Sequence, residues 1–112
     1  MTYNIPCHRR GDTWAGISSI TILVNGVPVN LQNASAKIEF RSNVDAPVAL
    51  TLSTTDGSIL ISQPLNGKIQ IPPRLIEIPY GKYYYDLQVT FPNGTIKTYM
   101  SGTWEIAFDI TE

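Results

Sequence analysis

The sequence predicts an all-β fold, an antiparallel β-sandwich of about seven or eight short strands. Three observations indicate this class. Apolar and polar residues alternate along most of the chain, which is the pattern of strands with one buried face. Turn signals rich in glycine, proline and asparagine separate the alternating segments. No window combines apolar residues at helical spacing with helix caps, so we expect no helix of useful length.

The first alternating segment is followed by a hairpin signal. It places three apolar side chains on one face, Ile20, Ile22 and Val24. Asn25-Gly26 comes next, and Asn-Gly between apolar runs is the strongest short-range hairpin signal, so Gly26 is assigned a structural role. Residues 27–31 form the expected return strand. Pro28 places it at a sheet edge, because proline has no amide hydrogen to donate.

The middle of the chain contains the clearest half-buried strand, residues 36–41. Its expected inward side chains are Ala36, Ile38 and Phe40, and its expected outward ones are Lys37, Glu39 and Arg41. Further strands are expected at 48–52, 58–61 and 68–71, with turns at Thr55-Asp56-Gly57 and Asn66-Gly67. Pro72-Pro73 ends this ladder, and residues 74–79 are expected to cross between layers with Ile76 and Ile78 as anchors.

The last hairpin contains the longest predicted strand, residues 82–91. Its expected inward side chains are Tyr83, Tyr85, Leu87, Val89 and Phe91. After the turn at Pro92-Asn93-Gly94, the partner strand is expected to break at Ser101-Gly102, since glycine inside a strand often marks a bulge. Beyond the break, four apolar side chains are expected to face one way, Trp104, Ile106, Phe108 and Ile110. Gly94 and Trp104 are assigned structural roles.

Length and composition limit the domain organisation and the function. The 112 residues match one domain. Residues 1–16 are less regular and form an expected N-terminal arm or edge segment, and residues 17–112 form a single β-sandwich domain. The charged fraction is 15%, below the average of about 25%, which favours a chain docked in an assembly. The net charge of −1 argues against phosphate-driven nucleic-acid binding.

No membrane span, cofactor site or catalytic centre is expected. The sequence contains no apolar run of about 18 residues, and one cysteine cannot build a disulfide framework or a multi-cysteine zinc site. Cys7 and the single histidine, His8, are adjacent, so in an extended chain they point to opposite sides. The acidic residues are scattered. The sequence therefore predicts a protein that is not an enzyme and has neither metal nor cofactor.

The run Tyr83-Tyr84-Tyr85 is the most unusual cluster. In strand register Tyr84 alone points outward, where it is available for contact with a partner. A carbohydrate-binding module is the alternative hypothesis, because exposed aromatic rings stack on sugars. Its candidate residues are Tyr80, Tyr84 and Tyr99.

The segment from Tyr80 to Val89 resembles the late strand of immunoglobulin-like (Ig-like) sandwiches. In those domains a tyrosine two residues before a cysteine hydrogen-bonds to the backbone at a corner. The resemblance implies that Tyr83 holds this corner and that Tyr85 takes the position of the cysteine. It implies an Ig-like sandwich without the disulfide.

A wider resemblance rests on the order of motifs along almost the whole chain. These are Arg10-Gly11-Asp12-Thr13-Trp14, Gly26-Val27-Pro28-Val29-Asn30-Leu31, the charged strand from Lys37 to Arg41, Gly81-Lys82-Tyr83-Tyr84-Tyr85-Asp86-Leu87, Asn93-Gly94-Thr95-Ile96-Lys97-Thr98-Tyr99 and Gly102-Thr103-Trp104. The pattern is similar to small structural proteins of tailed bacteriophages, in particular to the Ig-like N-terminal domain of baseplate upper proteins. Those domains attach receptor-binding parts to a tail.

This resemblance implies a virion structural protein, made in the host bacterial cytoplasm. Because the chain covers one domain, we expect a tail or baseplate adaptor or accessory subunit, with capsid decoration as an alternative. Its expected partners are other virion proteins, and we expect a homo-oligomer in the assembly. Since tryptophan, tyrosine and arginine dominate interface energies, the expected contact residues are Tyr3, Arg9, Arg10, Trp14 and Tyr84.

Overall fold

The computed structural model describes residues 2–108. Met1 and residues 109–112, including Ile110 with its expected inward side chain, lie outside this range. Within it the chain forms twelve strands and one 3-10 turn, so the all-β prediction is confirmed. The elements are β1 (Ile5–Arg9), β2 (Thr13–Trp14), β3 (Ile17–Thr21), β4 (Leu23–Val24), β5 (Val27–Pro28), β6 (Ser35–Arg41), β7 (Leu50–Ser53), β8 (Leu60–Gln63), η1 (Pro64–Asn66), β9 (Lys68–Ile71), β10 (Arg74–Leu75), β11 (Gly81–Thr90) and β12 (Ile96–Ala107). The count exceeds eight because four of these strands are pairs of residues.

The larger layer is a five-stranded sheet in the order β1-β12-β11-β6-β7. Its central strands alternate as the sequence predicts. The inward side chains of β6 are buried, and so are Tyr83, Tyr85, Leu87 and Val89 of β11. Burial of these side chains supplies most of the driving force for sheet formation.

The strand β12 differs from its prediction. It runs without a break through Ser101 and Gly102, and its irregularity lies where Leu87 pairs with Met100 and Gln88 with Thr98. The extra residue between those two pairs is Tyr99. A longer ladder therefore continues past the glycine, and the bulge lies three residues earlier than the glycine signal indicated.

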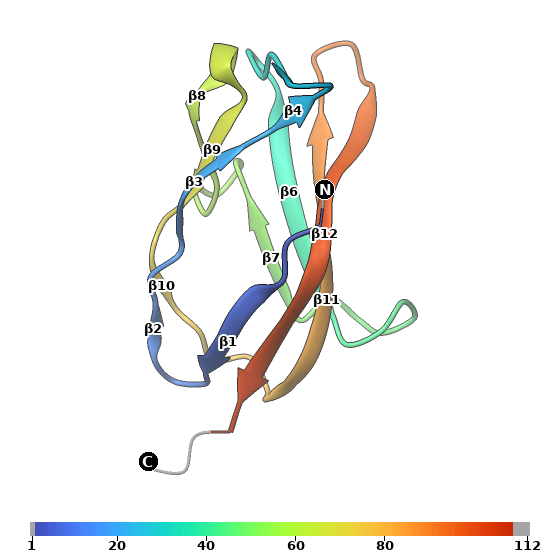
Figure 1. Ribbon diagram of the computed structural model, residues 1–112. Coiled ribbons are helices and arrows are strands. Elements are labelled where there is room, and N and C mark those ends of the chain that lie inside the picture. The colour runs from blue at the N-terminus through green and yellow to red at the C-terminus, as the bar shows by residue number, and fades with distance from the viewer. Residues whose placement is uncertain (1, 109–112) are drawn as a thin grey trace.

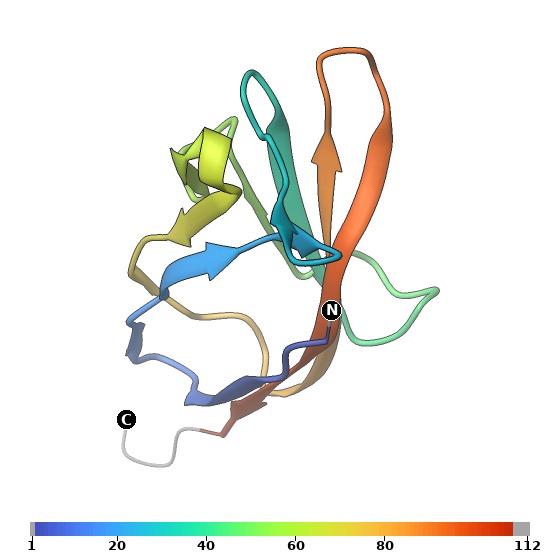
Figure 2. The same cartoon turned by 45° about the horizontal axis from the view of Figure 1, so that its top comes forward.

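The smaller layer faces the five-stranded sheet across the core (Figures 1 and 2). It consists of the sheet β3-β9-β8 and the two-stranded pair β2–β10. Its buried side chains include Ile20, Ile59, Ile69, Ile71 and Ile76. Aromatic rings lie at the centre of the core: the Trp104 ring is 4.6 Å from Trp14 and 5.2 Å from Phe40, centroid to centroid.

The hairpin β4–β5 forms at the predicted turn, but it is short. Asn25 and Gly26 both have positive φ, 52° and 78°, as a two-residue hairpin turn requires. The return strand ends at Pro28 instead of residue 31. Val24 has an exposed side chain instead of the expected buried one, because the pair β4–β5 has no further strand or layer on that face.

The N-terminal residues belong to the larger layer. The strand β1 pairs with β12 at the sheet edge, and the pairing is parallel, unlike the antiparallel pairing expected throughout. Three side chains of β11 and β12 hold β1 and the residues just before it. Trp104 Nε1 donates to the Pro6 carbonyl at 3.2 Å, Tyr85 Oη donates to the Tyr3 carbonyl at 2.5 Å, and Thr103 Oγ1 lies 3.3 Å from Asn4 Oδ1. Residues 5–9 are thus an edge strand of this sheet.

Candidate functional site

A groove lies on the outer face of the five-stranded sheet, over β6 and β11. Its volume is about 550 Å³, within the range of small-ligand sites. The residues that line it are Lys37, Glu39, Arg41, Asn43, Val44, Tyr84, Tyr85, Asp86 and Gln88. The loop between β6 and β7 contributes Asn43 and Val44, and the Val44 side chain is 90% exposed.

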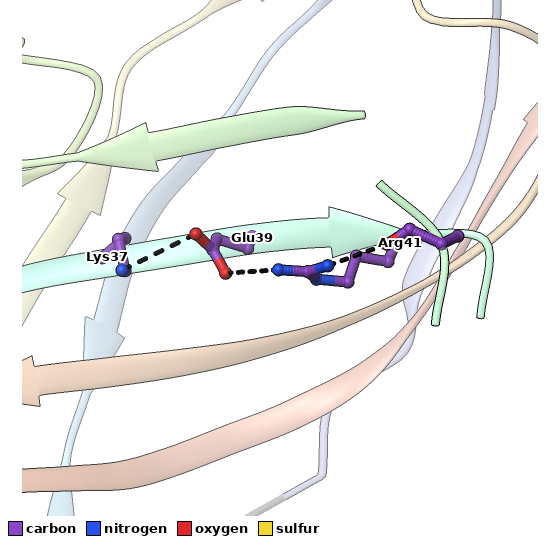
Figure 3. A network of polar contacts seen from close by, with 4 residues as sticks. Lys37, Glu39 and Arg41 are labelled. Carbon is purple, nitrogen blue, oxygen red and sulfur yellow. Dashed lines mark hydrogen bonds and ion pairs between the residues drawn. The ribbon is translucent and has the colours of Figure 1, made fainter. Parts of the chain in front are cut away.

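Three charged side chains on β6 form one wall of the groove, and Figure 3 shows them in a row along the strand. They share a face because they alternate with the buried Ile38 and Phe40 along the strand. Glu39 is paired with Lys37 at 3.6 Å and with Arg41 at 3.4 Å. Arg41 Nη1 also donates to the Ala46 carbonyl at 2.7 Å, so this guanidinium ties the β6–β7 loop to the sheet.

Tyr84 and Asp86 form the other wall, from β11. In the β6–β11 register Tyr84 faces Arg41 and Asp86 faces Glu39. Two carboxylates directly opposite each other repel. The ion pairs of Glu39 with Lys37 and Arg41 offset this repulsion. The Tyr84 side chain is 49% exposed, with the Lys82 ammonium 5.6 Å from its ring centroid.

A second exposed cluster lies at one end of the molecule, where β11 begins and β12 ends. The rings of Tyr80 and Phe108 meet edge to face at 5.1 Å, and these side chains are 60% and 56% exposed. Arg9 Nη1 donates to the Phe108 carbonyl at 3.1 Å. We call Arg9, Tyr80 and Phe108 the end cluster.

Phe108 is a surface residue, although alternation along β12 predicts an inward side chain. The strand ends at Ala107, so the alternation no longer determines the direction of Phe108. The weak signal available was Tyr80, which follows Pro79 and precedes the predicted strand. Only the pairing of Gly81 with Ile106 brings the two rings together.

The five expected contact residues do not form one surface. Arg9 belongs to the end cluster and Tyr84 to the groove, while Arg10 is partly buried and its amide donates to the Ala107 carbonyl at 3.0 Å. Tyr3 is exposed, although its carbonyl is bonded to Tyr85. The prediction that Trp14 contacts a partner is wrong. Its side chain is only 7% exposed and packs on Trp104, so it is a core residue that no partner reaches.

The three candidate sugar-binding tyrosines are also dispersed. Tyr84 lines the groove and Tyr80 lies in the end cluster. Tyr99 is partly buried at the β12 bulge, where its ring meets Phe91 edge to face at 6.4 Å. A single platform built from all three rings is therefore wrong.

The buried tyrosines of β11 have structural contacts. Tyr83 Oη donates to the Pro79 carbonyl, four residues earlier, at 2.5 Å, and burial raises the pKa of Tyr83. Burial also raises the pKa of Tyr85 to about 12. Both hydroxyls remain protonated at neutral pH, and both donate hydrogen bonds to backbone carbonyls.

Residues 2–108 contain no cluster of histidine, cysteine and acidic side chains that would hold a metal ion. Cys7 is exposed, and the ring of its neighbour His8 bonds instead to the Asp12 carbonyl, at 2.9 Å. In the same range no helix is long and apolar enough to cross a membrane.

Comparison with known proteins identifies no relative: no protein-family model matches the sequence, and no curated protein is significantly similar to it.

Proposed function

We propose that this chain is a non-enzymatic, Ig-like structural subunit of a tailed-bacteriophage virion. In this role it is a tail or baseplate adaptor or accessory subunit that binds neighbouring virion proteins. The order of sequence motifs described above supports the phage assignment. The arrangement of the strands supports the Ig-like assignment, and exposed side chains at the two ends of the molecule support the adaptor role.

Strand order favours an Ig-like sandwich. Ig-like domains divide their strands between a sheet containing the third, sixth and seventh strands and a sheet containing the second, fourth and fifth, and variable-type domains add a strand beside the third. In this chain β6, β11 and β12 take the places of the third, sixth and seventh strands, and β7 is the added strand beside the third. The second sheet is β3-β9-β8, whose strands take the places of the second, fifth and fourth. The bond from Tyr83 to the Pro79 carbonyl, four residues earlier, supports this assignment, because in a tyrosine corner the hydroxyl bonds to the backbone a few residues upstream.

The end cluster is the observation that carries the adaptor role. Two exposed aromatic rings beside an arginine are the residue types that contribute most to interface energies, and they lie together at one end of a molecule that measures 45 × 28 × 26 Å. The β4–β5 hairpin and the β11–β12 hairpin both point toward the other end in Figure 1, and Figure 2 shows that they are separate from each other. Exposed apolar side chains of those hairpins are Leu23, Val24, Val27 and Ile96.

Apolar side chains exposed at both ends suit a subunit that contacts one neighbour at each end. Such contacts bury the side chains in the assembly and leave few charges to desolvate, which agrees with the low charged fraction of 15%. We expect copies of the chain to form a closed homo-oligomer in the particle, because most assemblies of identical subunits have closed symmetry.

Mass spectrometry of gradient-purified phage particles tests the location. The expected result is the presence of the chain at a copy number compatible with three-fold or six-fold symmetry relative to the major capsid protein. Copies on the order of hundreds would indicate capsid decoration instead. Absence from the particle would overturn the structural role.

Incorporation of variants tests the end cluster. Tyr80→Ser combined with Phe108→Ser is expected to reduce incorporation by about tenfold or more, because interface hot spots contribute about 2 kcal/mol or more each. Leu60→Ser is the matched control, since it removes an exposed apolar side chain from β8, away from the end cluster. Equal incorporation of both proteins, each folded by circular dichroism, would remove the end cluster from the mechanism.

A further inference from the structure

The groove over β6 and β11 contains polar groups that the protein does not use itself. Within residues 2–108, the Asp86 carboxylate has no hydrogen bond or ion pair, and neither have the Gln88 amide and the Tyr84 hydroxyl. The Asn43 side-chain oxygen Oδ1 accepts from the Asp45 amide at 2.9 Å, which fixes the side chain and leaves its NH₂ group available. Acceptors and donors thus lie side by side around one exposed aromatic ring.

The wall of the groove is held in place before any ligand arrives. Arg41 anchors the β6–β7 loop at Ala46, and the Ala49 amide closes the loop on the Phe40 carbonyl at 2.8 Å. Tyr84, Asp86 and Gln88 alternate along the central strand β11, which is paired on both sides. A site on rigid strands loses little conformational entropy on binding.

The charges select a neutral ligand. Two cations, Lys37 and Arg41, and two carboxylates, Glu39 and Asp86, line the groove, so the formal charge of its lining is zero. The Lys82 ammonium lies outside this lining, 5.6 Å from the Tyr84 ring centroid. A cationic ligand that approaches Asp86 meets the two cations already paired with Glu39. An anionic ligand meets two carboxylates on opposite strands.

The unpaired carboxylate excludes an apolar occupant. Covering Asp86 without donating a hydrogen bond to it costs its full desolvation, so the ligand must present hydroxyl or amide donors. The Tyr84 ring and the aliphatic parts of Lys37 and Arg41 favour a ligand that also has a C–H face. A sugar ring combines both properties and carries no net charge.

We propose that the groove between β6 and β11 binds a neutral saccharide. Tyr84 stacks on the C–H face of a sugar ring, Asp86 accepts from its hydroxyl groups, and Gln88 and Asn43 complete the hydrogen bonds. This site is separate from the end cluster, and the proposal does not depend on the chain being a virion subunit.

Amide chemical-shift titration of the full chain with glucose, galactose, rhamnose and N-acetylglucosamine tests the site. At least one sugar is expected to bind with a dissociation constant of about 1–10 mM, shifting amides of residues 41–45 and 84–88. An arginine-containing tripeptide and acetate are the charged probes, and neither is expected to shift these amides.

Two tyrosine variants provide matched measurements. Tyr84→Ala is expected to weaken sugar binding by about tenfold, whereas Tyr80→Ala removes an exposed ring outside the groove and is expected to leave binding unchanged. Asp86→Asn is expected to weaken binding by about fivefold or more, because a charged acceptor is replaced by a neutral one. Tyr84→Phe keeps the ring and is expected to retain most of the affinity, which separates stacking from misfolding.

Three results would overturn the proposal. One is the absence of any shift with all four sugars at about 50 mM, well above a millimolar dissociation constant. The second is an equal loss of binding in Tyr84→Ala and Tyr80→Ala. The third is a shift of the groove amides by the tripeptide or by acetate alone, which would assign the groove to a charged ligand.

Discussion

The first strand, β1, and the β4–β5 hairpin differ in what holds them to the protein. β1 has no partner nearby in the sequence. Trp104 holds it directly, while Tyr85 and Thr103 hold Tyr3 and Asn4 just before it. The hairpin pairs with itself, Leu23 with Pro28 and Val24 with Val27, and its apolar side chains are exposed. Local turn chemistry is enough to specify the hairpin, whereas β1 is specified by residues at the other end of the chain.

The largest expected effect comes from removing the space that the Tyr3 backbone, two residues before β1, occupies. In the structure the Tyr3 carbonyl lies where a Cβ of residue 102 would be, with the Tyr85 ring behind it. Gly102→Ala is therefore expected to displace β1 and to lower the free energy of unfolding by about 3 kcal/mol. Urea unfolding measures the loss, and amide exchange of residues 5–9 locates it. A loss below about 1 kcal/mol would mean that β1 is not held as described.

Tyr85→Phe removes the bond to the Tyr3 carbonyl, just before β1, and keeps the ring in the core. The expected loss in the free energy of unfolding is about 1–2 kcal/mol at pH 7, because the Tyr3 carbonyl loses its buried donor. Urea unfolding of both proteins checks this value. No loss would show that water replaces the hydroxyl group.

The same variant tests the pH dependence. The pKa of Tyr85 is raised to about 12 in the folded protein, whereas the unfolded side chain titrates near its ordinary value of about 10. The folded state then binds more protons between these values, so stability is complete below about pH 10 and decreases as the pH rises towards 12, by about 1–2 kcal/mol. Tyr85→Phe is expected to flatten this decrease, leaving the smaller part due to Tyr83. An unchanged slope would contradict the assignment.

Gly26→Ala makes the same glycine-to-alanine change in the β4–β5 hairpin. Nothing lies within 4 Å of the added Cβ, but Gly26 has φ of 78°, which costs an L residue about 1 kcal/mol. The expected loss is thus about a third of that at residue 102, measured by the same urea unfolding. A larger loss would show that the hairpin takes part in the core.

The smallest effect is expected at the hairpin surface. Val27→Ser is expected to change the free energy of unfolding by less than about 0.5 kcal/mol, since its side chain is already in water. Thermal unfolding of the isolated chain measures it. If the exposed face binds a neighbour, the variant will in addition lower incorporation into particles.

The comparison also explains what could be predicted from the sequence. Alternation and turn chemistry are local, so the sequence predicts the inward faces of β6 and β11 and the turn at Asn25-Gly26. The parallel docking of β1 is not local. Gly102 leaves room for the Tyr3 carbonyl, which comes from a distant segment, but in the sequence a glycine inside a strand indicates a bulge. The residue type of Trp14 is common in interfaces and so predicts a contact role, whereas its burial depends on packing against Trp104, which is distant in the sequence.

The candidate site was predictable only in part. Tyr84 points outward because its neighbours in β11 point inward, and this follows from the sequence. The groove itself does not, because the position of Asn43 and Val44 depends on the bond from Arg41 to Ala46. The end cluster requires the pairing of β11 with β12 and the end of β12 at Ala107.

The parallel pairing of β1 with β12 has a kinetic consequence. Pro6 and Trp104, which share a hydrogen bond, are 98 positions apart, and contacts between distant segments form slowly because the loop must close before they contribute. The edge of β12 therefore stays open while the rest of the sheet assembles. We expect refolding on a timescale of roughly milliseconds to seconds, with the fluorescence change of Trp104 completing only when the N-terminal strand docks.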